Sequence, residues 1–520
     1  MLYPWFTFEQ ILPFIISALI LVAAIITFHF DKKMVALLLL FLGSLCLGYF
    51  MANLDHFLIL WDEQYHALVA KSMMSHPFEP SLYQFPVLDY DFKNWTANHI
   101  WLHKQPLFLW QIALSLKIFG TNALAVRVPS IIMHAFAALM IYRIGKISNS
   151  STVGFYGALF FTVAHYPLEL VSGRFGTDHN DIAFLFYVTA SFWAWSEYQY
   201  SQNKYWIILI GIFAGCAVLV KWVMGLLIYS VWTISIGIQD KKNWIRIKSY
   251  FPIMISFLIS IAIFLPWQLY IFHKFPQEAQ HEFTYNTRHF FEPIENQTGD
   301  IWYHFSAINK LYGSAFIIPF ILIFGLFFLI KNSNSKIYRI AILSAIIIVY
   351  GFYTVAATKI TSYCIIVSPF LFLAMGALFD ATFNFLKTIK RFKKIELVTR
   401  LIAVTVFCFL LVNLSRIQNY HTDWKPTDNF NRNAEMNEMK FIDKLSTNLS
   451  NDKWVVFNAA LRLYGHIPVM FYTDYIAYDF IPTAEQIEKI KKQTYKIAIR
   501  DDDNLPAYIR DDSDIIKIKL

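Results

Sequence analysis

Long apolar runs constrain this chain more than any other feature of its sequence. Twelve of them recur between residues 11 and 415 of the 520 residues, each close to the length that crosses a bilayer. Hydrophobic residues make up 57% of the chain and charged residues 15%, against about 25% charged in soluble domains. A soluble globule cannot bury that much apolar surface, so the sequence predicts a polytopic membrane protein. The same composition excludes disordered, collagen-like and coiled-coil folds.

The predicted spans follow from the length of each run. A spanning helix needs about 20 mostly apolar residues. The apolar stretch 106–119 is too short and is left out, since counting it would invert the side of every later loop. We predict spanning helices at residues 11–30, 34–54, 123–143, 152–170, 180–197, 205–220, 222–238, 250–272, 311–331, 338–357, 361–381 and 397–415.

The charges of the connecting loops support this count. With twelve spans, every short loop rich in Lys and Arg falls on one side, which the positive-inside rule assigns to the cytoplasm. The net charge of +8 therefore indicates cytoplasmic loops rather than a surface for nucleic acid. Both termini and two long loops, 55–122 and 273–310, then lie outside. The basic loop residues are Lys32, Lys33, Arg143, Lys146, Lys241, Lys242, Arg246, Lys248, Lys331, Lys336, Arg339, Lys387, Lys390, Arg391, Lys393, Lys394 and Arg400.

The composition changes after residue 415, where the chain becomes charged and loses its long apolar runs. Helix-like stretches near 433–448 and 484–493 alternate with strand-like runs, which is typical of a small α/β domain. The alternative is an irregular tail that docks on the membrane domain. We predict an all-α membrane domain over 1–415 and an extracytoplasmic α/β domain over 416–520. The strand-like runs are 454–457, 469–472, 497–499 and 515–518.

Two acidic residues, Asp62 and Glu63, follow the second span at the start of an amphipathic segment. They fit an N-terminal helix cap favoured by the helix dipole. They also fit carboxylates held at the membrane edge, one of them as a general base. A second acidic pair, Asp178 and Asp181, lies in the external turn after the fourth span, where capping of the next helix is again the structural alternative.

Cations gather at the same predicted membrane face. Arg and Lys suit phosphate oxygens, and ionisable residues at membrane depth are functional candidates. For Lys104 a side chain that snorkels to the interface is the alternative. We predict a site for a phosphate-bearing lipid that includes Lys104, Arg127, Arg174, Lys221, Lys359 and Tyr363.

The order of these residues resembles the GT-C-type glycosyltransferases that use polyprenyl- or dolichyl-phosphate sugars. That family includes the aminoarabinose transferase that modifies lipid A and the protein O-mannosyltransferases. The resemblance covers about residues 55–370. It rests on the Asp-Glu-x-Tyr pattern at Asp62, on Lys104 and Pro106 before an aromatic run, on Gly120 before Arg127, on the Arg-x-x-x-Asp turn at Arg174 and Asp178, and on Lys221, Pro266, Trp267, Lys359, Tyr363 and Pro369.

The resemblance implies roles for two residues. Asp62 would be the base, and Lys104 would lie beside the lipid phosphate. Relatives such as the aminoarabinose transferase carry Glu-Lys-Pro-Pro at this point, whereas this chain has His103-Lys104-Gln105-Pro106. No cofactor is expected to be required. His103 and His289 are the candidate ligands of a divalent metal, because imidazole suits zinc, while all four cysteines lie in or beside apolar runs.

The resemblance also implies a function. The expected enzyme moves a single sugar from a polyprenyl-phosphate donor to an extracytoplasmic acceptor, which is a glycolipid, a glycan or a protein, with inversion. The expected location is the plasma (inner) membrane, with the active site on the periplasmic face. The alternatives are an oligosaccharide ligase or oligosaccharyltransferase, a lipid flippase or transporter, and a membrane scaffold without catalytic activity.

Overall fold

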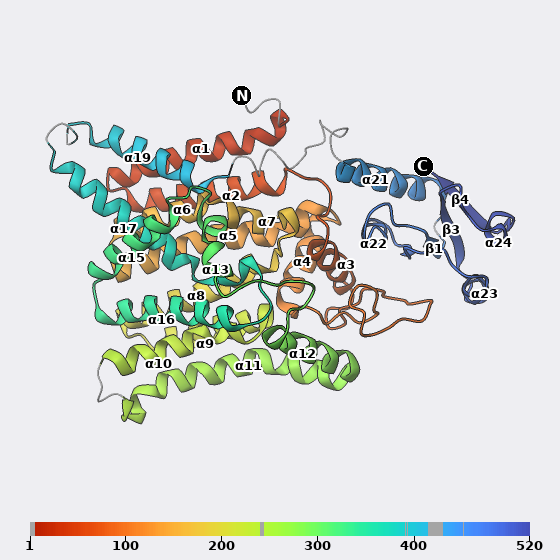
Figure 1. Ribbon diagram of the computed structural model, residues 1–520, viewed down its shortest axis with the longest axis horizontal. Coiled ribbons are helices and arrows are strands. Elements are labelled where there is room, and N and C mark those ends of the chain that lie inside the picture. Colours follow the sequence, from red (N-terminus) through yellow and green to blue (C-terminus); the bar gives the residue numbers. More distant parts are fainter. Residues whose placement is uncertain (1–5, 240–243, 390–391, 393, 414–429, 451) are drawn as a thin grey trace.

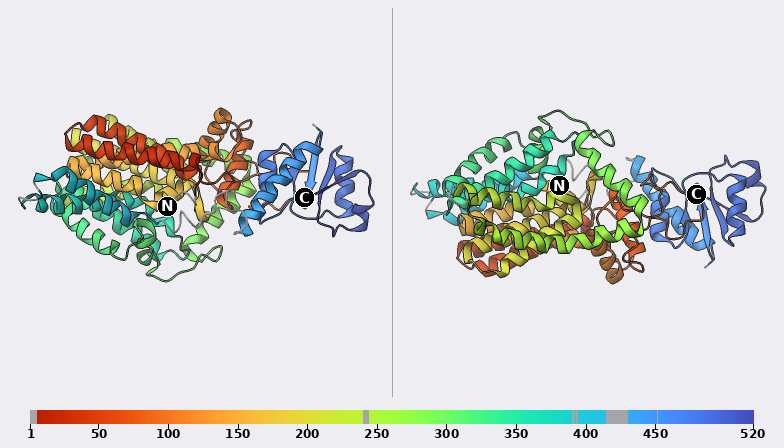
Figure 2. Two further views of the ribbon diagram at one scale, coloured as in Figure 1. Left: turned by 90° about the horizontal axis from the view of Figure 1, so that it is seen from above. Right: turned by 90° about the horizontal axis from the view of Figure 1, so that it is seen from below.

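Helices that run along the long axis of the molecule form a bundle in the computed structural model, and a smaller α/β unit extends from one end (Figures 1 and 2). The structure describes residues 6–239, 244–389, 392, 394–413, 430–450 and 452–520. The bundle helices are α1 (Phe8–His29), α2 (Lys33–Ala52), α5 (Ala123–Ser148), α6 (Ser151–Val163), α7 (His165–Val171), α8 (Asn180–Ser201), α9 (Tyr205–Lys221), α10 (Leu227–Gln239), α11 (Phe251–Lys274), α15 (Ile318–Lys331), α16 (Lys336–Val355), α17 (Ser368–Lys387) and α19 (Glu396–Leu411).

Each of the twelve predicted spans overlaps a helix of this bundle. Seven helical stretches among the described residues are long and apolar enough to cross a membrane. The span predicted at 152–170 is two helices, α6 and α7, because the backbone of Ala164 is extended between them. The stretch 106–119 forms a separate helix, α4 (Pro106–Phe119), whose 14 residues extend about 21 Å, less than a bilayer core of about 30 Å.

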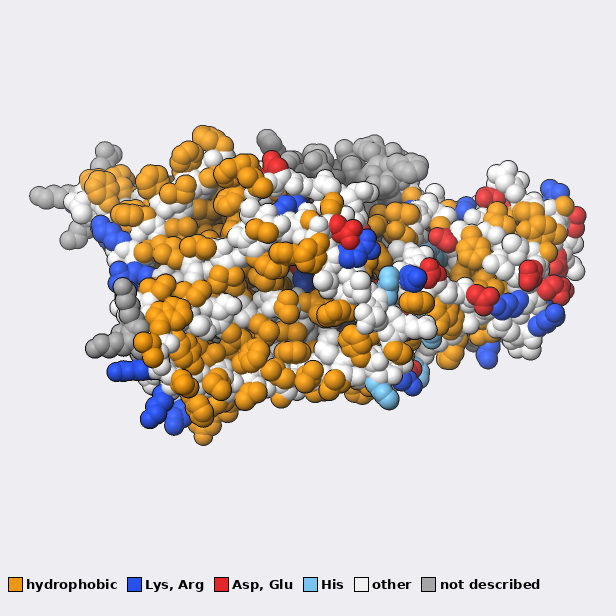
Figure 3. Space-filling view, turned by 60° about the horizontal axis from the view of Figure 1, so that its bottom comes forward, with side chains coloured by type: hydrophobic (Ala, Val, Ile, Leu, Met, Phe, Trp, Pro, Cys, Tyr) orange, Lys and Arg blue, Asp and Glu red, His pale blue; other side chains and the backbone are white. Residues whose placement is uncertain are grey.

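The two ends of the bundle differ in charge. Lys and Arg side chains gather at the end away from the α/β unit (Figure 3). The turns there begin or end helices at Lys33, Lys336 and Lys387. At the opposite end lie α3 (Asp62–Met73), α4, α12 (Pro276–Phe291), α13 (Tyr303–Ser306) and α14 (Ile308–Tyr312). They come from the two long loops predicted to be external, except that the last two residues of α14 belong to the span predicted at 311–331. The charge asymmetry is the one expected of a multi-pass membrane protein.

The C-terminal unit is built on a small sheet of four parallel strands, in the order β2-β1-β3-β4. In β1 and β3, Val455 pairs with Ile497, and both side chains are buried. The predicted boundary at 415/416 lies outside the described residues. The elements are α21 (Phe430–Asn448), β1 (Trp454–Phe457), α22 (His466–Tyr472), β2 (Ile476–Ala477), α23 (Ala484–Lys492), β3 (Lys496–Asp501), α24 (Ala507–Arg510) and β4 (Ile515–Lys519).

One predicted strand, 469–472, is wrong, because these residues lie in helix α22. Residues 466–471 are all buried, and a short run that is apolar on every side has no periodicity to separate a helix from a strand. Helix α22 packs on α3, and Lys71 of α3 donates to the carbonyl oxygen of Met470 at 3.0 Å. The α/β unit is therefore docked on the first external loop.

Candidate functional site

A polar cavity of about 440 Å³ opens at the end of the bundle that carries the α/β unit. Its wall includes the start of α3, the segment before α4, the start of α8 and the end of α9. The second external loop and the segment between α16 and α17 complete it. Among the predicted site residues, the cavity is lined by Asp62, His103, Lys104, Asp178, Asp181, Lys221, His289 and Tyr363.

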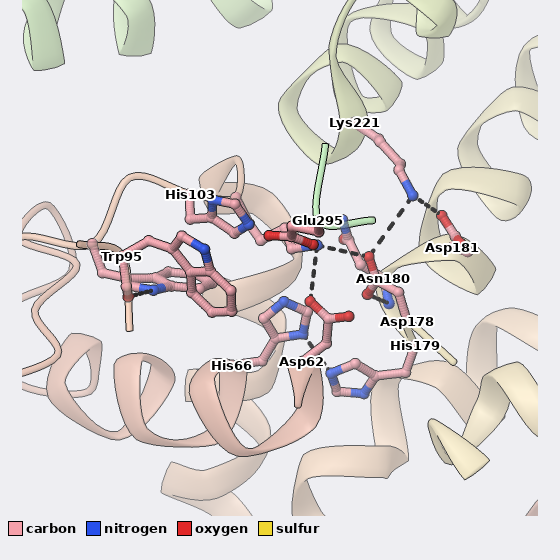
Figure 4. A network of polar contacts seen from close by, with 12 residues as sticks. Asp62, His66, Trp95, His103, Asp178, His179, Asn180, Asp181, Lys221 and Glu295 are labelled. Atoms are coloured by element: carbon pink, nitrogen blue, oxygen red, sulfur yellow. Dashed lines mark hydrogen bonds and ion pairs between the residues drawn. The ribbon is translucent and has the colours of Figure 1, made fainter. Parts of the chain in front are cut away.

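Alternating carboxylates and ammonium groups cross this cavity (Figure 4). Lys104 Nζ lies 3.0 Å from Asp62 Oδ1 and 2.9 Å from Asp178 Oδ2. Lys221 Nζ lies 3.8 Å from the same Asp178 oxygen and bonds to Asp181. Three carboxylates and two lysines from four separate segments thus form one ionic network. All five side chains are less than a quarter exposed, so solvent screens them weakly.

The two carboxylates beside Lys104 have opposite pKa shifts. Burial and the negative charge of Asp178 raise the pKa of Asp62, although Lys104 acts against them. Burial also disfavours ionisation of Asp178, but the charges of Lys104 and Lys221 outweigh it and hold the pKa of Asp178 below its usual range. Two carboxyl groups with divergent pKa values are a common arrangement in sites where one of them exchanges a proton.

A stacked pair of imidazoles, which sequence reasoning did not select, lies under this network. His66 and His179 are fully buried, their ring centroids are 4.8 Å apart, and His66 Nδ1 lies 2.6 Å from His179 Nε2. Burial lowers the pKa of both rings to about 3, so both are neutral. The sequence feature that could have identified this pair is its spacing from the carboxylates, because His66 lies one helical turn after Asp62 and His179 directly follows Asp178.

Strained aromatic residues also line the cavity. Trp61, Phe175 and Trp222 have φ angles of 83°, 57° and 59°, in a region that bulky residues avoid. Trp61 directly precedes Asp62, and Trp222 directly follows Lys221. Such strain costs about 1–3 kcal/mol per residue and persists where surrounding structure enforces it, commonly at functional sites.

Glu63 and Arg127 lie outside the cavity and pair with each other. Both side chains are 1% exposed, and neither lines the cavity formed by the described residues. Arg127 Nε and Nη2 donate to the two carboxylate oxygens of Glu63 at 2.6 and 2.9 Å. The physical reason is helix geometry, because adjacent residues point about 100° apart, so Asp62 faces the cavity and Glu63 faces α5.

Lys359 and Arg174 also lie elsewhere. Lys359 Nζ donates to the carbonyl oxygens of Tyr353, Thr354 and Ala356 at 2.6–3.0 Å, which caps the C-terminal end of α16. Arg174 is 1% exposed and lines a separate apolar groove, with its guanidinium 5.5 Å from the ring of Phe175.

His103 and His289, the predicted metal ligands, both line the cavity, and each has a hydrogen-bonding partner of its own. His103 Nδ1 lies 3.2 Å from Glu282 Oε2, and His289 Nδ1 lies 3.2 Å from the hydroxyl of Thr358. The ring of Tyr285 contacts both imidazoles, with centroid distances of 5.7 and 5.6 Å. Among the described residues, one group of three acidic or histidine side chains lies close enough together to hold a metal ion: Asp62, His66 and Asp178, whose ligand atoms lie within 4.8 Å of one another.

Comparisons with known proteins agree with this architecture. A sequence profile of the dolichyl-phosphate-mannose-protein mannosyltransferase family matches residues 103–270. The undecaprenyl phosphate-α-4-amino-4-deoxy-L-arabinose arabinosyl transferase of Pseudomonas paraeruginosa is 23% identical over 192 residues, which cover 34% of this chain and 32% of that protein. The matches thus span about a third of the length of the curated relatives.

Solved structures extend the likeness to most of the chain. The crystal structure of ArnT from Cupriavidus metallidurans bound to undecaprenyl phosphate superposes with a TM-score of 0.64 at 11% identity, covering 88% of both chains. An Archaeoglobus fulgidus oligosaccharyltransferase in its apo form gives 0.53 at 13% identity, covering 89% of this chain and 69% of that one. These comparisons confirm the predicted resemblance and the predicted fold class.

Proposed function

We propose that this chain is an integral-membrane glycosyltransferase that moves one sugar from a polyprenyl-phosphate donor to an acceptor. One observation carries the proposal: the network of Asp62, Lys104, Asp178 and Lys221 lines a cavity at the end of a membrane-spanning bundle. A similar fold is known with undecaprenyl phosphate bound, which supports a lipid-phosphate donor.

The network supplies the groups that an inverting displacement needs. Asp62 accepts the proton of the acceptor hydroxyl, whose oxygen forms a bond to the anomeric carbon. The bond from that carbon to the phosphate oxygen breaks, and its electron pair leaves with the polyprenyl phosphate. Lys104 and Lys221 stabilise the charge that develops on this phosphate in a partly desolvated cavity. Asp178 and Asp181 hold the two ammonium groups in position before the donor arrives.

The alternatives fit less well. A transporter is expected to place its charged groups near the middle of the bilayer, whereas here they line the cavity at the end of the bundle that carries the α/β unit. An oligosaccharyltransferase is less favoured because the chain resembles ArnT more closely and over more of that protein's length. We expect the protein in the inner membrane, and by the positive-inside rule the cavity would face the periplasm.

The first test is transfer by the purified protein from a panel of polyprenyl-phosphate sugars. Wild type should release polyprenyl phosphate from at least one donor. Lys104→Gln should lower kcat by about 10²–10³-fold, the usual loss when one group that stabilises a developing oxyanion is removed. Lys117→Gln changes an exposed lysine of α4 and is the matched control. Release of free sugar-phosphate, or equal rates in the two variants, would contradict the assignment.

We propose that no divalent metal is required. The ammonium of Lys104 already bridges the carboxylates of Asp62 and Asp178, and a cation held by Asp62, His66 and Asp178 would compete with it. Dialysis against EDTA should therefore leave the transfer rate unchanged. A loss of activity that zinc or manganese restores would overturn this expectation.

Turnover should also depend on pH through Asp62. A general base acts only when ionised, so kcat/KM should rise as pH increases through the Asp62 pKa. Burial and Asp178 raise that pKa, so the acid limb should lie above the usual carboxylate value of about 3.9. The pH profile of kcat/KM, measured with one donor and saturating acceptor, checks this. An acid limb below that value would be inconsistent with Asp62 as the base.

A further inference from the structure

Two arginines hold the turn that leads into Asp62, one from each part of the molecule. Arg127 of α5 donates to the carbonyl oxygen of Phe57 at 2.7 Å. Arg462, which lies between β1 and α22, donates to the next carbonyl oxygen, that of Leu58, at 3.2 Å. The C-terminal unit meets the bundle here, where α22 packs on α3 (Figure 1). The turn is therefore fixed by the C-terminal unit as well as by the membrane bundle.

Arg462 is itself held firmly within the C-terminal unit. Its Nε donates to Glu438 Oε2 at 3.0 Å, and its Nη1 donates to Glu435 Oε1 at 2.9 Å. All three side chains are at most 11% exposed. The planar guanidinium presents its donors in a fixed fork, so two carboxylates leave it little freedom. Its contact with Leu58 is thus made by a group whose position α21 has already set.

A second contact from the same loop reaches the residue next to the proposed base. The ring of Tyr464 lies edge-on to the ring of Trp61, with a centroid distance of 5.5 Å, and at the same distance from the ring of Tyr65. Tyr464 and Trp61 both have positive φ angles, of 61° and 83°. Bulky residues avoid such angles, which persist where surrounding structure enforces them. Trp61 lines the cavity and directly precedes Asp62.

We propose that Arg462 and Tyr464 are positioning residues, which hold the turn at Trp61 so that the carboxylate of Asp62 faces Lys104 and the cavity. The inference rests on the proposed function, since it adds positioning residues to the same site. A base must lie within hydrogen-bond reach of the proton that it accepts. The C-terminal unit thus contributes to the rate of transfer through the placement of one carboxylate, without touching the substrates.

The main test removes the Tyr464 ring. Tyr464→Gly suits the positive φ angle at this position, so the substitution adds no backbone strain. It should lower kcat by about 10²-fold, the loss that a misplacement of about 1 Å can cause. The donor KM should stay unchanged, because Lys104 keeps its contact with Asp178. Tyr464→Phe keeps the ring and should transfer at the wild-type rate. Leu463→Gly is the matched control, since it loosens the same loop but removes a side chain that is 57% exposed.

Arg462→Lys tests the other contact. It keeps a positive charge beside Glu435 and Glu438 but loses the fork that also reaches Leu58. Its kcat should fall in the same direction as that of Tyr464→Gly, again with the donor KM unchanged. A wild-type kcat in both variants would overturn the inference.

A double substitution separates positioning from general damage. If Tyr464 acts through Asp62, adding Tyr464→Gly to Asp62→Asn should lower kcat no further. A variant that only loses folded protein would lower the rate by the same factor in both backgrounds. Equal factors, or equal losses in Tyr464→Gly and Tyr464→Phe, would therefore contradict a positioning role for the ring.

Hydrogen exchange gives a readout that needs no sugar transfer. The amide of Ile59, which donates to Glu63 at 2.6 Å, reports on the turn. Amides of residues 58–61 should exchange faster in Tyr464→Gly than in wild type, whereas those at the far end of α3, where Lys71 contacts α22, should not change. If wild type transferred no sugar from any donor, the proposed function would fail, and exchange would still decide whether the C-terminal unit holds the turn. Equal exchange in both proteins would overturn that contact.

Discussion

Replacing Asp62 with Asn should lower sugar transfer by about 10²–10⁴-fold, the contribution that a positioned base commonly makes. The asparagine has nearly the same shape, but it cannot accept the proton of the acceptor hydroxyl. The effect should appear in kcat rather than in the donor KM, because Lys104 retains its second carboxylate partner, Asp178. Steady-state transfer kinetics with one polyprenyl-phosphate sugar measure both parameters.

The variant should remain folded, because the Asp62 side chain is 13% exposed at the cavity wall and the buried pair of Glu63 and Arg127 holds the start of α3 in place. Asp91→Asn is the matched control, since Asp91 lies exposed in the same external loop and accepts a hydrogen bond from the amide of Lys93. The residual activity of Asp62→Asn should also lose the acid limb of the pH profile. Turnover close to wild type would exclude Asp62 as the base.

The sequence alone was sufficient to predict that four of the site residues lie at the same membrane face. Asp62, Lys104, Asp178 and Lys221 lie far apart in the chain, but each follows or precedes an apolar run at the same predicted face. Counting spans therefore placed them at one end of the bundle. That inference needs only hydropathy and loop charge, which depend on composition rather than on atomic detail.

Side-chain direction could not be obtained in the same way. Asp62 and Glu63 are adjacent and equally acidic, and the rotation of α3 about its axis decides which of them faces the cavity. Lys359 likewise lies at the predicted face, yet its flexible stem folds back on the carbonyl groups of α16. Both outcomes depend on tertiary packing, for which the local sequence carries no pattern.

The two buried histidines are residues of the site that the sequence did not predict. His66 and His179 lie close in sequence to two carboxylates of the site, Asp62 and Asp178. A single histidine in a helix, however, is usually a core residue whose hydrogen bonds are satisfied. Their significance comes from a contact between residues 113 positions apart in sequence. A pairing over that distance is set by how α3 packs against the start of α8.

The pair of Glu63 and Arg127 gives the second large effect that we expect, on stability rather than on catalysis. Besides Glu63, Arg127 donates to the carbonyl oxygens of Ala52, Asp55 and Phe57, and thereby joins α5 to the turn that leads into α3. Arg127→Met would leave the carboxylate of Glu63 buried without its cation. Breaking such a pair costs about 3–5 kcal/mol in the free energy of unfolding.

Unfolding of Arg127→Met in detergent, by heat or by titration with sodium dodecyl sulfate, measures this loss. Arg143→Met is the matched control: Arg143 forms the same two-bond contact with Glu197, but its side chain is 30% exposed. Trp193 Nε1 still donates to Glu197 at 3.1 Å in that variant, so the effect should be smaller. Because Arg127 lies outside the cavity, the folded fraction of Arg127→Met should transfer sugar with a donor KM like that of wild type. If it were as stable as Arg143→Met and yet bound donor poorly, Arg127 would be the phosphate ligand that the sequence suggested, and the structural role assigned to it would be wrong.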